Sequence, residues 1–252
     1  FSCWQSSLFE FIKNILGRAK NKLHLQSMQT ISREDYLKAI LKIEEEAGSV
    51  SNQSLVEKLS TRPASVTNML HTLADAGWVE HEAYKGVRLT DSGKEIALST
   101  LRKHRLWEVF LVDKLSFSWD EVHQWAEDLE HVGDEELTNR LDAFLGHPAF
   151  DPHGDPIPTA QGQWSDGRNL IPASKGVVGD RIQLKGVVDS GEAYLQHLDR
   201  LKIELGLILE VSKSLDFDES KTLIWPDGSE ASLSKQTLQN MLVEKLSGKA
   251  KN

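Results

Sequence analysis

Histidine and glutamate recur at helical spacing in the middle of this chain. The residues concerned are His104 and Glu108, four positions apart, followed by His123, Glu127, Glu130 and His131 at i, i+4, i+7 and i+8. On one α-helix the last four lie along a single face, where their side chains converge. Two imidazoles and two carboxylates on one face are costly to bury unless a cation pairs with them. The spacing therefore indicates a divalent metal site.

A solvated acidic helix face is the competing interpretation. One His-x3-Glu pair usually means no more than that, and Asp128, Glu135 and Glu136 make the region acidic in any case. Two such pairs together with the Glu-His doublet favour the metal. A metalloenzyme would need an open coordination position and a nearby acid or base. Because the sequence carries no HExxH or other catalytic signature, we expect no enzyme and no small organic substrate.

A second set of polar residues precedes the histidines. Pro63 and the apolar positions that follow it predict a helix over about 63–76, preceded by helices over 31–47 and 51–59. Its outward positions could meet base edges or phosphates, and they are Arg62, Ala64, Ser65, Thr67 and Asn68. Alternating residues at 78–83 and 87–90 then predict a β-hairpin, to which Lys85 and Arg88 would bring positive charge. This order of elements is typical of a winged helix-turn-helix.

DNA binding is not the only interpretation of that pattern. A helical hairpin packed for structure alone, or a regulator that needs no metal, would show the same periodicity. The net charge is −9, and residues 28–102 hold 9 Lys/Arg against 11 Asp/Glu, so the region is not basic. Binding to double-stranded DNA would therefore depend on a few well-placed cations and on dimerisation.

The bulk composition sets the class of protein. A chain of 252 residues suits two or three small domains. Cys3 is the only cysteine, which excludes an intrachain disulfide and a cysteine-rich zinc ribbon and fits a reducing cytoplasm. No apolar run approaches the roughly 20 residues that a membrane-spanning helix needs, so we expect no membrane partner.

The segments form a mainly α chain with a β-rich C-terminal domain. Residues 1–27 are an N-terminal extension to which no function is assigned. We expect a winged helix-turn-helix at 28–102, a helical metal-binding and dimerisation domain at 103–150, a Gly/Pro-containing linker at 151–175 and a small barrel at 176–247. Within the barrel, Asp227-Gly228 is a strong hairpin signal.

Several stretches in the same order resemble one family. They are EDYLKAILKIEEE, RPASVTNMLHTL, YKGVRLTDSGK, RKHRLWEVFL and EVHQWAEDLEHVGDEE, followed by GDPIP. Together they are similar to the diphtheria toxin repressor and manganese transport regulator family of bacterial metalloregulators, over about residues 31–247. The resemblance implies an SH3-like barrel, a homodimer and recognition of palindromic operator DNA. It also implies metal-dependent repression of metal-uptake genes.

The resemblance further implies two metal sites per subunit. The primary site would use Asp35, Glu127, Glu130 and His131. The ancillary site would use His104, Glu108 and His123 with one ligand from the barrel, for which Asp189 is our choice and Glu192 the alternative. Asp35 comes from the first helix, so a metal bound there would connect the DNA-binding region to the metal-binding region.

The ligand types favour manganese. Iron-responsive members of the family place a methionine and a cysteine where this chain has Asp35 and Glu127, whereas hard oxygen ligands suit Mn²⁺. An Fe²⁺-responsive regulator, or one that uses another divalent metal, is the alternative. Some manganese regulators also have a glutamate where this chain has Lys38, so we do not expect two closely spaced manganese ions. The metal would act by favouring the conformation that fits DNA.

Overall fold

A computed structural model describes residues 26–82, 86–164 and 169–246 of the chain, which forms two compact units. Unit 1 contains the described residues up to Phe110, together with Trp125–His147 and Pro158–Gln163. Unit 2 contains Leu111–Gln124, Pro148–Ile157 and the described residues from Trp164 onward. Nearly all of the predicted extension, residues 1–25, lies outside the described residues.

Unit 1 begins with the three helices that the periodicity predicts. They are α2 (Gln26–Ala47), α3 (Asn52–Lys58) and α4 (Pro63–Asp75). Ser51 caps α3 by accepting a hydrogen bond from the backbone of Ser54. Pro63 stands in the first turn of α4, where its missing N–H costs nothing. The apolar side chains that face inward from these helices form the core, among them Leu37, Ile40, Leu41, Leu55, Val66, Leu70 and Leu73.

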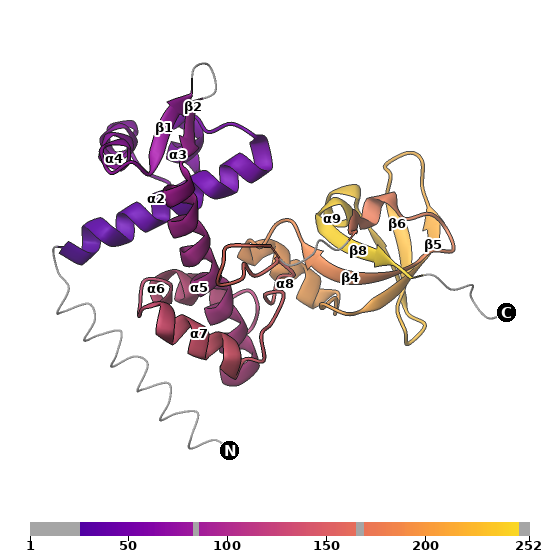
Figure 1. Ribbon diagram of the computed structural model, residues 1–252. Coiled ribbons are helices and arrows are strands. Elements are labelled where there is room, and N and C mark those ends of the chain that lie inside the picture. Colours follow the sequence, from indigo (N-terminus) through magenta and orange to yellow (C-terminus); the bar gives the residue numbers. More distant parts are fainter. Residues whose placement is uncertain (1–25, 83–85, 165–168, 247–252) are drawn as a thin grey trace. The chain divides into compact units, whose positions relative to one another are not determined.

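A two-stranded hairpin follows α4 and lies beside the three helices in Figure 1. Strand β1 (Val79–Glu82) pairs antiparallel with β2 (Gly86–Leu89). The backbone N–H of Val87 donates to the carbonyl of Val50, 3.0 Å away, which fastens the hairpin to the segment between α2 and α3. Helix–helix–turn–helix–hairpin is the arrangement that the sequence predicts for a winged helix-turn-helix.

Three more helices carry the histidine-rich region. Helix α5 (Asp91–Leu115) is followed by α6 (Val122–Leu129) and α7 (Glu135–Phe144). Helix α5 ends where Ser116 adopts a positive φ of 58°. Asp134 caps α7 by accepting a hydrogen bond from the backbone N–H of Leu137.

Unit 2 is built on a six-stranded antiparallel sheet, in line with the small SH3-like barrel that the sequence predicts. Its strands, in the spatial order β3-β8-β4-β5-β6-β7, are β3 (Ile171–Pro172), β8 (Met241–Lys245), β4 (Arg181–Val187), β5 (Ile208–Ser214), β6 (Lys221–Ile224) and β7 (Glu230–Leu233). The Asp227-Gly228 turn joins β6 to β7 as predicted. Two short helices that the sequence did not predict, α8 (Glu192–Arg200) and α9 (Lys235–Asn240), pack leucines into the same core.

The segment predicted as a linker is irregular but packed. The carbonyl of His153 accepts a hydrogen bond from the backbone N–H of Val187 at 3.0 Å, and a Cβ on Gly154 would collide with the carbonyl of Lys185. Residues 148–157 therefore lie closely against β4 within unit 2. Among the described residues, no helix is both long and apolar enough to cross a membrane.

Candidate metal centre

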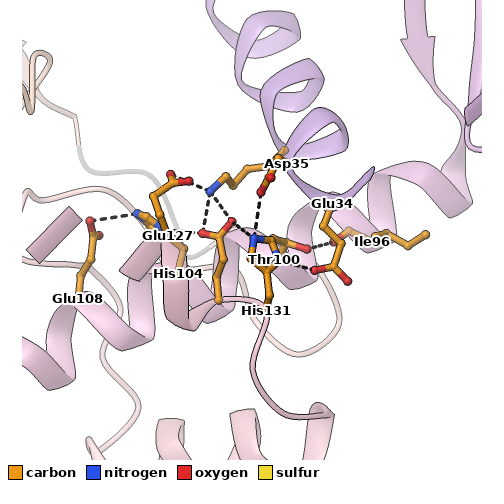
Figure 2. Close-up of polar contacts among 10 residues, drawn as sticks. Glu34, Asp35, Ile96, Thr100, His104, Glu108, Glu127 and His131 are labelled. Atoms are coloured by element: carbon orange, nitrogen blue, oxygen red, sulfur yellow. Dashed lines mark hydrogen bonds and ion pairs between the residues drawn. The ribbon is translucent and has the colours of Figure 1, made fainter. Parts of the chain in front are cut away.

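Carboxylates and imidazoles from α2, α5 and the end of α6 meet inside unit 1 (Figure 2). Helix α6 ends at Leu129, so Glu130 and His131 stand in the turn that follows it, although the backbone N–H of Glu130 still donates to Ala126 at 2.8 Å. The prediction that Glu130 and His131 continue the helix is therefore wrong, because α6 ends directly before them. The side chains nevertheless converge on the same cluster.

Glu130 lies at the centre of this cluster and its side chain is fully buried. Its Oε1 and Oε2 accept hydrogen bonds from Nζ of Lys38 at 2.5 and 2.6 Å. Nδ1 of His104 lies 2.5 Å from Oε2, and Nε2 of His131 lies 3.6 Å from Oε1. Three nitrogen-bearing side chains thus surround one carboxylate, which offsets the cost of removing it from water.

His104 bridges two carboxylates. Its Nε2 lies 3.1 Å from Oε1 of Glu108, and its Nδ1 lies against Glu130. Burial alone would lower the pKa of this imidazole, but the negative charge of Glu108 and the hydrogen bonds to both carboxylates raise it above its ordinary value. A carboxylate beside each nitrogen favours the charged imidazolium form of His104.

His131 lies between α2 and Glu130. Its Nδ1 lies 2.7 Å from Oε2 of Glu34, and its Nε2 lies 3.0 Å from Oδ1 of Asp35. Burial opposes the charged imidazolium, but Asp35, Glu34 and Glu130 outweigh it and raise the pKa of His131 to about 9. Protons therefore occupy nitrogens that could otherwise bind a cation.

The cluster fits a divalent metal ion. Oδ1 of Asp35 is buried, and Nε2 of His131, 3.0 Å away, forms an ion pair with it but, within the described part of the chain, no hydrogen bond of good geometry. A buried carboxylate oxygen in that position favours a cation nearby. One ligand atom from each of Asp35, Glu130 and His131 lies within 4.8 Å of the others. Carboxylate oxygens with one imidazole are donors that suit Mn²⁺ or Fe²⁺.

Glu127 is also part of this cluster. Its Oε1 accepts a hydrogen bond from Nζ of Lys38 at 3.0 Å, and one of its oxygens can approach ligand atoms of His104 and Glu130 within 4.8 Å. Of the four residues predicted for the primary site, Asp35, Glu130 and His131 form one group of ligand atoms, and Glu127 belongs to a second group with Glu130 and His104. The sequence did not predict the ion pairs of Lys38 or the contact of Glu34 with His131, although both residues lie within three positions of Asp35 on α2.

The remaining predicted ligands, which are His123 and the two candidates from the barrel, belong to unit 2, and their part in metal binding stays a prediction. His123 is half-buried on α6. Asp189 is exposed before α8, where its Oδ1 accepts a hydrogen bond from the backbone N–H of Gly191 at 2.8 Å. Glu192, the first residue of α8, accepts a hydrogen bond from Gln196.

The residues predicted to contact DNA lie at the start of α4 and on the hairpin. Arg62 precedes the first turn in extended conformation, and the side chains of five of these residues are exposed at the helix start: Arg62, Ala64, Ser65, Thr67 and Asn68. Arg88 is exposed on β2, with Nε 3.9 Å from Oε1 of Glu44. Lys85 lies outside the described residues.

Two family models match consecutive parts of the chain. The N-terminal DNA-binding domain of iron-dependent repressors matches residues 28–87, and their metal-binding and dimerisation domain matches residues 90–159. A solved manganese-dependent transcriptional repressor in complex with manganese is 34% identical, with a TM-score of 0.75 over 85% of this chain and 100% of that one. The chain belongs to the iron-dependent repressor family. The predicted family and fold class are thereby confirmed.

Relatives of this iron-dependent repressor family member differ in the metal they are named for. The iron-dependent repressor IdeR of Mycobacterium tuberculosis is 34% identical over 50% of this chain and 54% of its own length, so the chain spans about half of that relative. The diphtheria toxin repressor of Corynebacterium glutamicum is 25% identical over 85% of this chain and 96% of its own length. These names describe repressors, which agrees with the prediction of a regulator rather than an enzyme.

Proposed function

We propose that this protein is a metal-dependent transcriptional repressor that binds double-stranded operator DNA as a homodimer and responds to Mn²⁺. The observation that carries the proposal is the meeting of Asp35, on the first helix of the winged helix-turn-helix, with Glu130 and His131, at the end of α6. An ion held by all three residues would tie the DNA-binding part of unit 1 to its metal-binding part.

A bound ion would supply positive charge in place of the proton that the raised pKa of His131 keeps on its imidazole. Asp35 and His131 would orient α2 through that ion, and α2 packs against the rest of the winged helix-turn-helix through its buried leucines and isoleucines. The ion shifts the population of conformations only as far as it binds the DNA-competent one more tightly. Repression of metal-uptake genes would follow when the cell's metal supply is high.

An ancillary metal site is a further part of the proposal. His104 and Glu108, both buried on α5, would be completed by His123 and by Asp189, with Glu192 as the alternative barrel ligand. The support lies in the burial of His104 between two carboxylates and in the family resemblance.

The choice of Mn²⁺ rests on Asp35 and Glu127. Oxygen ligands at both positions are harder than the methionine and cysteine of iron-responsive members, and hard ligands suit Mn²⁺. Fe²⁺ is the alternative, since IdeR is named for iron. The alternative predicts that Fe²⁺ promotes DNA binding at lower free concentration than Mn²⁺ does.

The test is operator binding by the full chain, measured by fluorescence anisotropy at fixed ionic strength with Mn²⁺, Fe²⁺ or no metal. We expect at least a tenfold gain in affinity with Mn²⁺. Asp35→Met combined with Glu127→Cys should shift the preference towards Fe²⁺, and Arg62→Ala should weaken DNA binding without changing metal affinity. Operator affinity that is independent of metal would overturn the proposal.

A further inference from the structure

The connection between α5 and α6 packs against the barrel. It consists of residues 116–121 and belongs to unit 2, together with residues 111–115 of α5 and 122–124 of α6. Trp119, in the middle of this connection, packs its half-buried indole against the apolar core of the barrel. Connections between helices usually face solvent, whereas this one contributes an aromatic side chain to the core of another part of the chain.

Helix α8 of the barrel makes two hydrogen bonds to the connection. Nε1 of Trp119 donates to Oδ1 of Asp199 at 2.9 Å. Nε2 of Gln196 donates to Oδ2 of Asp120 at 3.2 Å, and also to Oε1 of Glu192 at 2.9 Å. Asp199 and Gln196 are three positions apart and therefore lie on the same face of α8. That face binds two successive residues of the connection.

A second part of unit 2 also contacts Trp119. Nε2 of the buried His153 lies 2.7 Å from the carbonyl oxygen of Trp119. The imidazole and the indole stack, with ring centroids 6.4 Å apart and an angle of 14° between the ring planes. Because the backbone of His153 is hydrogen-bonded to β4, Trp119 is held by two separate parts of the barrel unit. All of these contacts are made between protein groups.

We infer that Trp119, Asp199 and Gln196 form a latch by which α8 holds the α5–α6 connection in the metal-free protein, and that this latch positions His123. The fully buried Val122 and then His123 begin α6 directly after the connection. The family resemblance joins the barrel to the ancillary site only through a barrel residue that ligates the ion, whereas the latch exists before an ion binds. Only the role given to His123 rests on the proposed function, because the latch itself requires no metal.

Hydrogen–deuterium exchange of the full chain, freed of metal with a chelator, tests the latch. Asp199→Ala removes an exposed acceptor and leaves the core intact, so the amides of residues 117–121 should exchange about fivefold faster, the effect of losing one hydrogen bond. Trp119→Phe, which cannot donate, should add little to Asp199→Ala when the two are combined. Arg200→Ala is the matched control and should exchange like wild type. It changes the next exposed side chain of α8, which has no hydrogen bond or ion pair to the connection in the described part of the chain.

Unchanged exchange in metal-free Asp199→Ala overturns the latch, and so does an acceleration that appears only after Mn²⁺ is added. Because Asp199 is exposed, this variant does not depend on whether a substitution in the core folds.

Equilibrium dialysis with MnCl₂ tests the positioning of His123. The ancillary ion is identified as the one lost in His123→Ala. Trp119→Ser should weaken its binding at least about fivefold, because the closed connection becomes a minor state, and should leave the ion at the cluster of Asp35, Glu130 and His131 unchanged. Trp225→Ser, which removes another indole packed against the same core, is the matched control. Equal ancillary affinity in both variants contradicts the positioning role.

The proposed function fails separately from this inference. A latch that opens in metal-free Asp199→Ala, in a protein whose operator affinity does not respond to Mn²⁺, would stand without the regulatory role. Metal-dependent operator binding with exchange unaffected by Asp199→Ala would do the reverse.

Discussion

Glu130 shows how one buried side chain can connect three parts of unit 1. Its carboxylate contacts Lys38 of α2 and His104 of α5. Glu130 also directly precedes His131 in the chain. A buried carboxylate costs several kcal/mol unless it is paired, and removing one partner of such a pair costs about 3–5 kcal/mol. The metal-free cluster is thus held by protons and an ammonium group, which a metal ion must partly replace.

Proton release on metal binding follows from the same contacts. The pKa of His131 is raised to about 9, and the pKa of His104 is also raised. In metal-free protein, protonated His131 stabilises the folded state fully below its unfolded pKa of about 6.5, and this contribution is lost as the pH rises through about 9. A metal ion needs the neutral imidazole, so binding must expel the proton.

We therefore expect Mn²⁺ affinity to rise with pH from about 6.5 to about 9. Isothermal titration calorimetry at neutral pH, in buffers of different ionisation enthalpy, should show about one proton or more released per ion bound at the Asp35 cluster. His131→Gln, which cannot hold the proton, should release fewer. Zero release by the wild type would contradict the protonation state described here.

At the scale of elements, the hairpin depends on one glycine. Gly86 has a φ of +89°, and a Cβ at this position would collide with the carbonyl oxygen of Val50. The collision cannot be relieved by a side-chain rotation, because Val50 O is backbone and accepts a hydrogen bond from Val87. Close packing of the hairpin against the α2–α3 segment therefore requires glycine.

Gly86→Ala should destabilise unit 1 by at least about 2 kcal/mol, since strain at positive φ and a backbone collision add. Gly48→Ala is the matched control: Gly48 also has a positive φ, of 71°, but nothing lies within 4 Å of its added Cβ. The control should lose only about 1 kcal/mol. Urea denaturation followed by circular dichroism measures both, and equal losses would show that the contact with Val50 is unimportant.

Local signals in the sequence predicted these elements well. Pro63 marks the start of α4, the change from helical to alternating periodicity marks the hairpin, and Asp227-Gly228 marks the β6–β7 turn. Each of these signals depends on only a few neighbouring residues, so contacts with the rest of the chain do not override it. The helices α8 and α9 were missed because they are only nine and six residues long and lie within a β-rich stretch.

Contacts between distant residues were harder to predict. Lys38 meets Glu130 across 92 positions, and a lysine one turn after Asp35 carries no sequence signal that it will be buried. The end of α6 at Leu129 was not predicted either. Asp35 entered the predicted primary site only through the family resemblance, because helix periodicity could not connect it to a region nearly a hundred residues away.

At the scale of the whole molecule, the proposed repressor must dimerise to read a palindrome. Unit 1 has an aromatic cluster suited to that role: Trp107 and Phe110 on α5 lie with ring centroids 5.6 Å apart, and Phe110 lies 6.3 Å from Phe144 on α7. Phe144 is 66% exposed. An exposed aromatic side chain that continues a half-buried aromatic cluster is typical of an interface.

Phe144→Glu should therefore shift the protein towards monomer, because a carboxylate would have to be buried against a second copy of the same surface. Phe217→Glu is the matched control, since Phe217 is a fully exposed phenylalanine of unit 2 without an aromatic neighbour among the described ring contacts. Sedimentation velocity should show at least a tenfold weaker dimer for Phe144→Glu alone. Mn²⁺ binding at the Asp35 cluster should persist in that monomer, because all four of its predicted ligands come from one chain, whereas operator affinity should fall. Loss of dimer in the Phe217 variant instead would place the interface on unit 2.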